Sequence, residues 1–94
     1  MKLGVVIGQV VSTIKSHGFS SDRLLLVESI GPDGTGLGDV HVAIDNIGAG
    51  TGEWVLVVRG SSARKNVGND APVDMSIIGI VDEVVVKEKL VYKK

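Results

Sequence analysis

Residues 46–64 read NIGAGTGEWVLVVRGSSAR, in which three glycines within five positions lead directly into an apolar run. A glycine-rich loop can hold a phosphate, but the dinucleotide-binding fingerprint is G-x-G-x-x-G and a helix must follow it. Here the spacing is G-x-G-x-G, and residues 53–59 are typical of a strand. The chain also lacks the Gly-Lys-Ser or Gly-Lys-Thr of a P-loop. We therefore predict that the glycines are needed because the loop adopts positive φ or because its main chain packs closely against another segment.

The rest of the chain repeats this alternation of glycine clusters with short runs rich in valine and isoleucine, which is typical of an all-β sandwich or barrel. The turn-forming connection GPDGTGLGD is expected at 31–39, and one helical turn capped by Ser61 or Ser62 is expected within 61–72. We predict an all-β fold, a small five-stranded β-barrel with a short helical turn, as a single domain over residues 1–94. The expected strands are 2–15, 23–30, 40–45, 53–59 and 76–86, with a short pairing segment in KLVYK at 89–93.

Composition argues against several classes of function. Ten Lys and Arg against 11 Asp and Glu give a net charge of −1 without a basic block, so charge favours neither nucleic acid nor a membrane surface as a partner. The absence of cysteine removes disulfides, thiolate metal sites and thiol catalysis, and it favours a cytosolic setting. The first 15 residues lack a cleavage site and carry polar residues well short of a membrane span, so we expect a mature, soluble N-terminus.

Apolar residues occupy both faces of two predicted strands, at 3–11 and at 76–86. An antiparallel sheet with one solvated face should instead alternate between apolar and polar residues. Either a neighbouring subunit covers the second face, or a bulge at Gly8 or Gly79 turns some residues inward and leaves a barrel with an apolar exterior. The pattern favours the oligomer.

Candidate catalytic groups are few. His17 and His41 are the only imidazoles and lack the spacing of a metal site, so we interpret them as surface histidines and predict no metal. Asp45 and Glu53 bracket the glycine loop, where carboxylates more often accept backbone N–H groups than act as an acid–base pair.

Two further constellations also fail as catalytic sites. Asp82 and Glu83 face opposite sides of their strand, so they cannot share a substrate atom. A Ser61 or Ser62 nucleophile would need a histidine base and a sharp turn after a parallel strand, which the sequence does not indicate. We predict no enzyme and no cofactor; a hydrolase would require a confirmed turnover that Asp45→Asn or Ser62→Ala abolishes.

Three stretches of the chain resemble one family. AIDNIGAGTGEWVLVVRGSSAR at 43–64, VVIGQVVST at 5–13 and PVDMSIIGIVDEVV at 72–85 are similar to the vertex proteins of bacterial microcompartments, the EutN/CcmL family of carboxysome, propanediol and ethanolamine shells. The ethanolamine-utilisation members look most similar. DNIGAGTGE and GSSAR at fixed spacing are the most specific part of a resemblance that covers nearly the whole chain.

This resemblance implies a five-stranded barrel similar to an OB-fold and a homo-oligomeric ring, which is expected to be a pentamer, with a hexamer as the alternative. The pentamer would close a microcompartment shell in the cytoplasm at its corners, next to hexameric shell proteins. A flat layer of hexagonal tiles closes into a polyhedron only with five-fold positions, which such a ring supplies.

Eleven residues are the predicted assembly, interface or pore residues. At least one loop glycine is expected at positive φ, with the loop at or near the subunit interface or central axis. Arg64 is predicted to bind a carboxylate or carbonyls of an adjacent chain, and the first candidate acceptors are Asp45, Glu53 and Asp82. The alternative is a solvated arginine. The eleven residues are Asp45, Gly48, Ala49, Gly50, Gly52, Glu53, Ser61, Ser62, Ala63, Arg64 and Asp82.

The alternative function is an OB-like module that binds single-stranded nucleic acid. Such a module needs exposed aromatic side chains and a basic groove. Phe19, Trp54 and Tyr92 are the only aromatic residues of this chain.

Overall fold

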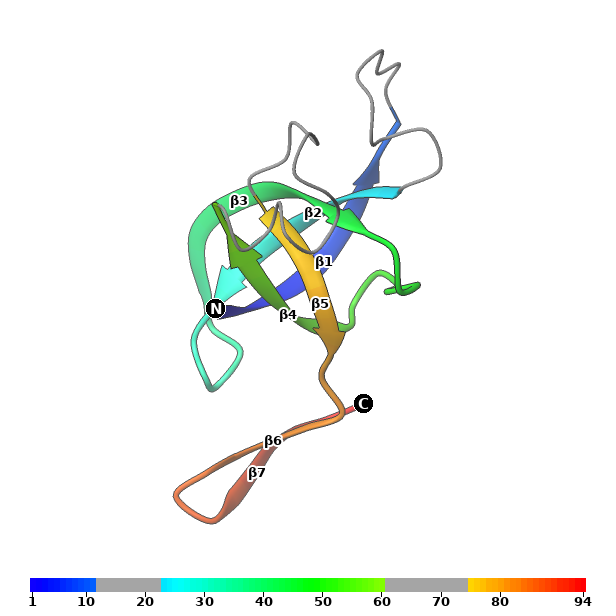
Figure 1. Cartoon of the computed structure of the whole chain (residues 1–94). Coiled ribbons are helices and arrows are strands. Elements are labelled where there is room, and N and C mark those ends of the chain that lie inside the picture. The colour runs from blue at the N-terminus through cyan, green and yellow to red at the C-terminus, as the bar shows by residue number, and fades with distance from the viewer. Residues whose placement is uncertain (12–22, 61–74) are drawn as a thin grey trace.

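The structure is a computed structural model, and it describes residues 1–11, 23–60 and 75–94. These residues form strands and turns, with no helix among them. Five strands close into a barrel in the order β1-β2-β3-β5-β4, and two more form a separate two-stranded sheet (Figure 1). The predicted all-β, five-stranded barrel is confirmed. The strands are β1 Lys2–Val10, β2 Arg23–Ile30, β3 Gly36–Asp45, β4 Trp54–Arg59, β5 Met75–Ile80, β6 Glu83–Val86 and β7 Lys89–Lys93.

One pairing in the barrel differs in direction from the others. The neighbours β1–β2, β2–β3, β1–β4 and β4–β5 are all antiparallel, whereas β3 meets β5 in parallel through one registered pair, Ile44 with Ser76. The helical turn predicted at Ser61 or Ser62 and the last part of the predicted strand 2–15 lie outside the described residues.

Bulges bend the barrel next to the two glycines that the sequence singled out. On β1 the pairing passes from Val6 to Gly8, which leaves Ile7 as an extra residue. On β5 it passes from Gly79 to Ile77, which leaves Ile78 extra. A bulge increases local twist and curvature, which a barrel of this size requires. Ile7 is nevertheless 45% exposed, so the bulge on β1 does not turn this side chain into the core.

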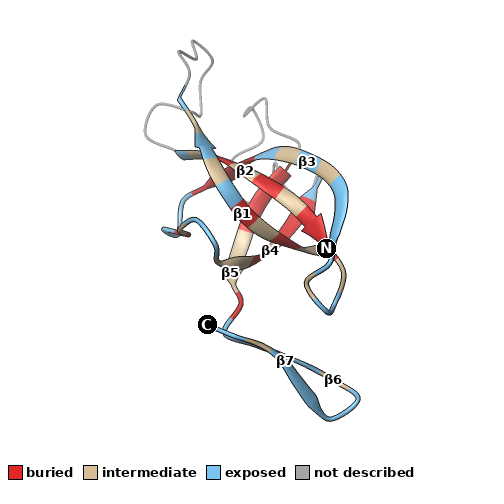
Figure 2. Cartoon of the chain, turned by 180° about the vertical axis from the view of Figure 1, so that it is seen from behind, coloured by how far each residue is buried: buried red, intermediate tan, exposed pale blue. Residues whose placement is uncertain are grey.

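The core lies inside the barrel, where Figure 2 shows the buried segments facing one another. Gly4 lets β1 approach β2, because a Cβ at this position would collide with the side chain of Val27. The buried cluster consists of Val6, Leu25, Val27, Ala43, Ala49, Val55, Val57, Met75 and Ile77, with the partly buried Ile80 packed against it.

Two predicted boundaries were wrong. The predicted strand 76–86 is two strands, because the N–H of Val81 donates to the carbonyl of Trp54 at 2.8 Å and the chain then leaves the barrel to pair within a hairpin. The predicted connection 31–39 is shorter, because the irregularity in the β2–β3 ladder brings Gly36 opposite Ile30 and starts β3 there.

Candidate functional site

The glycine loop is shaped by the buried carboxylate of Asp45, the last residue of β3. Its Oδ1 accepts the N–H groups of Ile47 at 3.0 Å and Gly48 at 3.3 Å, and its Oδ2 accepts the N–H of Ala49 at 3.0 Å. These bonds place Ala49 in the core with no exposed surface. Asp45 thus has the loop-shaping role that its place beside the turn predicted.

Glu53 fixes the other end of the loop. Its Oε1 accepts the N–H of Gly50 at 2.6 Å, while its own N–H donates to the carbonyl of Gly50 at 3.1 Å. The hydrogen bond from Gly50 lowers the pKa of Glu53, and Lys94, whose Nζ lies 3.4 Å from Oε2, lowers it further. Both flanking carboxylates therefore serve the turn.

Two of the three loop glycines adopt positive φ, as predicted: Gly48 at 92° and Gly52 at 91°. The N–H of Gly52 donates to the carbonyl of Val6 at 2.8 Å, and the N–H of Val6 donates to the carbonyl of Glu53 at 3.0 Å. The loop is thereby bonded to β1 beside its bulge. At Gly50 an added Cβ would meet only Glu53 Oε1, at 3.4 Å, so there is space for a Cβ at this position.

The three candidate acceptors for Arg64 differ in access. The side chain of Asp45 is fully buried and its Oδ2 already lies 3.5 Å from Arg23 Nη1, whereas Glu53 is partly exposed and Asp82 is exposed. Arg64 itself lies outside the described residues, as do Ser61, Ser62 and Ala63. The assembly roles of all eleven residues stay predictions.

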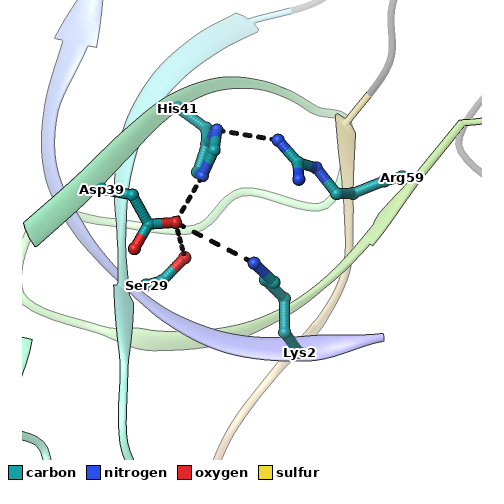
Figure 3. Close-up of polar contacts among 5 residues, drawn as sticks. All are labelled: Lys2, Ser29, Asp39, His41 and Arg59. Atoms are coloured by element: carbon teal, nitrogen blue, oxygen red, sulfur yellow. Dashed lines mark hydrogen bonds and ion pairs between the residues drawn. The ribbon is translucent and has the colours of Figure 1, made fainter. Parts of the chain in front are cut away.

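A polar network that the sequence analysis missed lies within the ring of barrel strands in the view of Figure 3. Asp39 Oδ2 accepts a hydrogen bond from Ser29 Oγ at 2.8 Å and lies 2.7 Å from His41 Nε2 and 3.9 Å from Lys2 Nζ. Arg59 Nη2 lies 3.1 Å from His41 Nδ1. The bond with His41, followed by that with Ser29, lowers the pKa of Asp39 to about 2. An Asp-x-His pair on one strand face was the available signal.

The bonding order of this network is not that of a serine hydrolase. In a hydrolase the serine donates to the histidine, whereas here Ser29 donates to Asp39. Because the Arg59 guanidinium can only donate, His41 accepts at Nδ1 and donates from Nε2 to Asp39. Neither ring nitrogen is left as a free base. Among the described residues, no three His, Asp or Glu side chains form a cluster that could hold a metal ion.

Comparison with known proteins places this barrel in a family. The family model described as "Ethanolamine utilisation protein EutN/carboxysome" matches residues 1–82. The chain belongs to this family. It is 56% identical over 95 aligned residues to the bacterial microcompartment shell vertex protein EutN of Escherichia coli strain K12, with 100% of both chains covered.

Solved structures of the family agree with the fold. A structure described as "Ethanolamine utilization protein, EutN" matches with a TM-score of 0.94 at 56% identity, covering 100% of this chain and 99% of that one. The GrpN pentameric microcompartment shell protein from Rhodospirillum rubrum matches with a TM-score of 0.82 at 42% identity, covering 92% and 99%. The family resemblance seen in the sequence is confirmed. Within the described ranges, no helix is long and apolar enough to cross a membrane.

Proposed function

We propose that this chain is a structural shell protein that forms the pentameric vertex of a bacterial microcompartment, of the ethanolamine-utilisation type. The observation that carries the proposal is its full-length likeness, at 56% identity, to a protein named as a microcompartment shell vertex protein. A relative with 42% identity is described as pentameric, which supports the same ring for this chain. The ring would lie in the microcompartment shell, in the cytoplasm.

The proposed activity is geometric. Five copies related by a rotation repeat one heterologous interface until the ring closes, and a five-fold ring fits the corner of a layer of hexagonal tiles. The neighbours of the ring would be hexameric shell proteins. We infer no enzymatic role, because the described carboxylates of the loop and the Asp39 network are engaged in bonds that hold the fold.

The mass of the native assembly tests this proposal. One chain has a mass of 9.8 kDa, so a pentamer has a mass of about 49 kDa, which native mass spectrometry distinguishes from a hexamer of about 59 kDa. A monomer across micromolar concentrations would overturn the proposal. A hexamer would keep the ring and overturn the vertex role.

Two further experiments separate the vertex role from other functions. Shells made from hexameric shell proteins with and without this chain should differ in electron micrographs, with closed polyhedra only when the chain is present. Labelled oligonucleotides at low salt should not bind; saturable binding that salt weakens would favour the nucleic-acid module instead.

A further inference from the structure

The hairpin of β6 and β7, here called the arm, extends away from the barrel in both Figure 1 and Figure 2. Its base is bonded to the barrel. The ring of Tyr92 stacks on that of Trp54, the N–H of Val81 donates to the Trp54 carbonyl, and Lys94 pairs with Glu53. The base therefore fixes the direction of the arm, while its far end has no barrel strand beside it.

The far end of the arm exposes apolar side chains. Val85 and Leu90 are cross-strand partners, and they are 58% and 54% exposed. Within the described ranges, β6 and β7 pair only with each other. A lone two-stranded hairpin is at best marginally stable in water, so these side chains require cover from another surface.

The turn of the arm adds to this requirement. Lys87 and Glu88 both have positive φ, 51° and 68°, in a two-residue connection. Such turns favour Asn-Gly, because residues with a Cβ are disfavoured in the left-handed region. An unfavourable turn persists when surrounding contacts hold it, and the described part of this chain supplies none at the far end.

A complementary apolar surface lies on β3. This strand carries three exposed large hydrophobic residues, more than any other barrel strand: Leu37 at 62%, Val40 at 48% and Val42 at 47%. Val40 and Val42 share one face, and Glu28 of β2 stands opposite Val40 in the ladder. Residues 83–94 contain four lysines and two glutamates, so their net charge is +2. The whole chain has a net charge of −1, and residues 1–82 therefore have a net charge of −3. Charge therefore also favours contact between the arm and a barrel.

We propose that the arm of one subunit packs Val85 and Leu90 on the outer face of β3, at Val40 and Val42, of the next subunit in the ring. A heterologous interface needs two different patches on each chain that fit each other, and the arm and the β3 face are two such patches. The inference rests on the proposed ring.

Substitution in the arm tests whether it holds the ring. The double variant Val85→Asp with Leu90→Asp should raise the concentration at which the ring dissociates at least tenfold, because it places carboxylates against an apolar face. The matched control, Val85→Leu with Leu90→Ile, keeps the apolar surface and should keep the ring. Emission of the single tryptophan, Trp54, checks that the base of the arm and the barrel remain intact in both variants.

Cross-linking tests where the arm binds. The chain has no cysteine, so Val42→Cys combined with Leu90→Cys provides one defined pair. Oxidation should give a reducible ladder up to five chains on a denaturing gel, while each single variant should stop at dimers. The control pair, Thr51→Cys with Leu90→Cys, should give no ladder.

The outcomes separate this inference from the proposed function. A monomeric wild-type protein overturns both. A wild-type pentamer whose aspartate variant remains a pentamer overturns the arm contact alone. Dissociation of that variant without a ladder from the cysteine pair overturns the assignment to β3. If the pentamer persists but shell assembly is lost, the arm contacts a different shell protein and the inference is wrong.

Discussion

The ring of Tyr92 stacks on the ring of Trp54, with centroids 4.1 Å apart and planes inclined by 14°. Trp54 begins β4 of the barrel and Tyr92 lies in β7, so this stack joins the two sheets. The Tyr92 hydroxyl also accepts the N–H of Trp54 at 3.3 Å. Gly34, at a φ of 91°, leaves space for the indole, because a Cβ there would lie 2.7 Å from Trp54 Cζ2. Rings that stack on each other offer little platform for the bases of a nucleic acid.

Removal of this stack should loosen the arm without unfolding the barrel. We expect Tyr92→Ala to shift the emission of the single tryptophan to longer wavelength, because water replaces the tyrosine ring. The free energy of unfolding should fall by about 1 kcal/mol or more, since an aromatic pair contributes roughly 0.5–1.5 kcal/mol beyond its buried area. Tyr92→Phe keeps the ring and should retain the wild-type spectrum. Unchanged emission in Tyr92→Ala would contradict the stack.

Because the Asp45 carboxylate accepts several backbone N–H groups, we expect Asp45→Asn to lower the free energy of unfolding substantially. The amide keeps one acceptor oxygen and has an NH₂ group in place of the other. That NH₂ group faces either the N–H groups of Ile47 and Gly48, which now bond to Oδ1, or the N–H of Ala49, which now bonds to Oδ2. Each orphaned buried donor costs about 1–3 kcal/mol, so we expect a loss of about 2–3 kcal/mol in urea unfolding.

The matched control for Asp45→Asn is Glu83→Gln, which makes the same chemical change at an exposed residue. Surface substitutions of this kind usually change stability by less than about 0.5 kcal/mol. Equal stability of the two variants would show that Asp45 does not organise the glycine loop.

We expect the folded chain to lose stability at low pH as Asp39 becomes protonated. The hydrogen bond with His41 lowers its pKa from 3.8 to about 2 in the folded chain. A carboxyl with a lowered pKa stabilises the fold above its unfolded pKa, and this contribution is lost as the pH falls from about 4 through about 2. Unfolding of wild type and Asp39→Asn across this range should therefore give a flatter pH dependence for the variant. Titration of the Asp39 carboxyl by carbon NMR near its ordinary pKa would contradict the network, and His41→Ala should move its pKa toward that value.

The features that the sequence predicted are those with local signals. Valine-rich runs between glycines indicated the barrel strands, because a half-buried pleated surface favours β-branched residues. The carboxylates at 45 and 53 indicated a shaped loop, because they directly flank the turn whose N–H groups they accept. Glycines in a five-residue loop indicated positive φ for the same local reason.

Features decided by tertiary pairing could not be predicted. Residues 76–86 contain Asp82 and Glu83 directly after Val81, but two charged residues can also stand on the two faces of one continuous strand. The break is decided by a tertiary contact, the bond from the Val81 N–H to the Trp54 carbonyl, which ends the barrel strand. The Asp39 network joins side chains from β1, β2, β3 and β4, which meet only because the barrel closes. Charge and spacing in the sequence carry no record of that closure.

Gly50 provides the test of whether the loop lies at the subunit interface. Gly48 and Gly52 have positive φ, so a side chain at either position strains the monomer itself. Gly50 does not, and only Glu53 Oε1 lies near its missing Cβ. We therefore expect Gly50→Val to leave the melting curve of the barrel nearly unchanged and to weaken the ring at least tenfold, as measured by native mass spectrometry over a dilution series.

A control for Gly50→Val should place a valine at an exposed position of the same region without a collision inside the monomer. Gly36 is unsuitable, because a Cβ there collides with the carboxylate of Glu28. Thr51→Val, at the exposed neighbouring position, changes the chemistry of the loop but adds little volume, and it should leave the ring intact. If the rings of wild type, Gly50→Val and Thr51→Val all dissociate at the same concentration, the loop lies away from every subunit contact. Loss of the folded monomer in Gly50→Val would show instead that the glycine serves the barrel, because the side chain then meets its own chain rather than a neighbour.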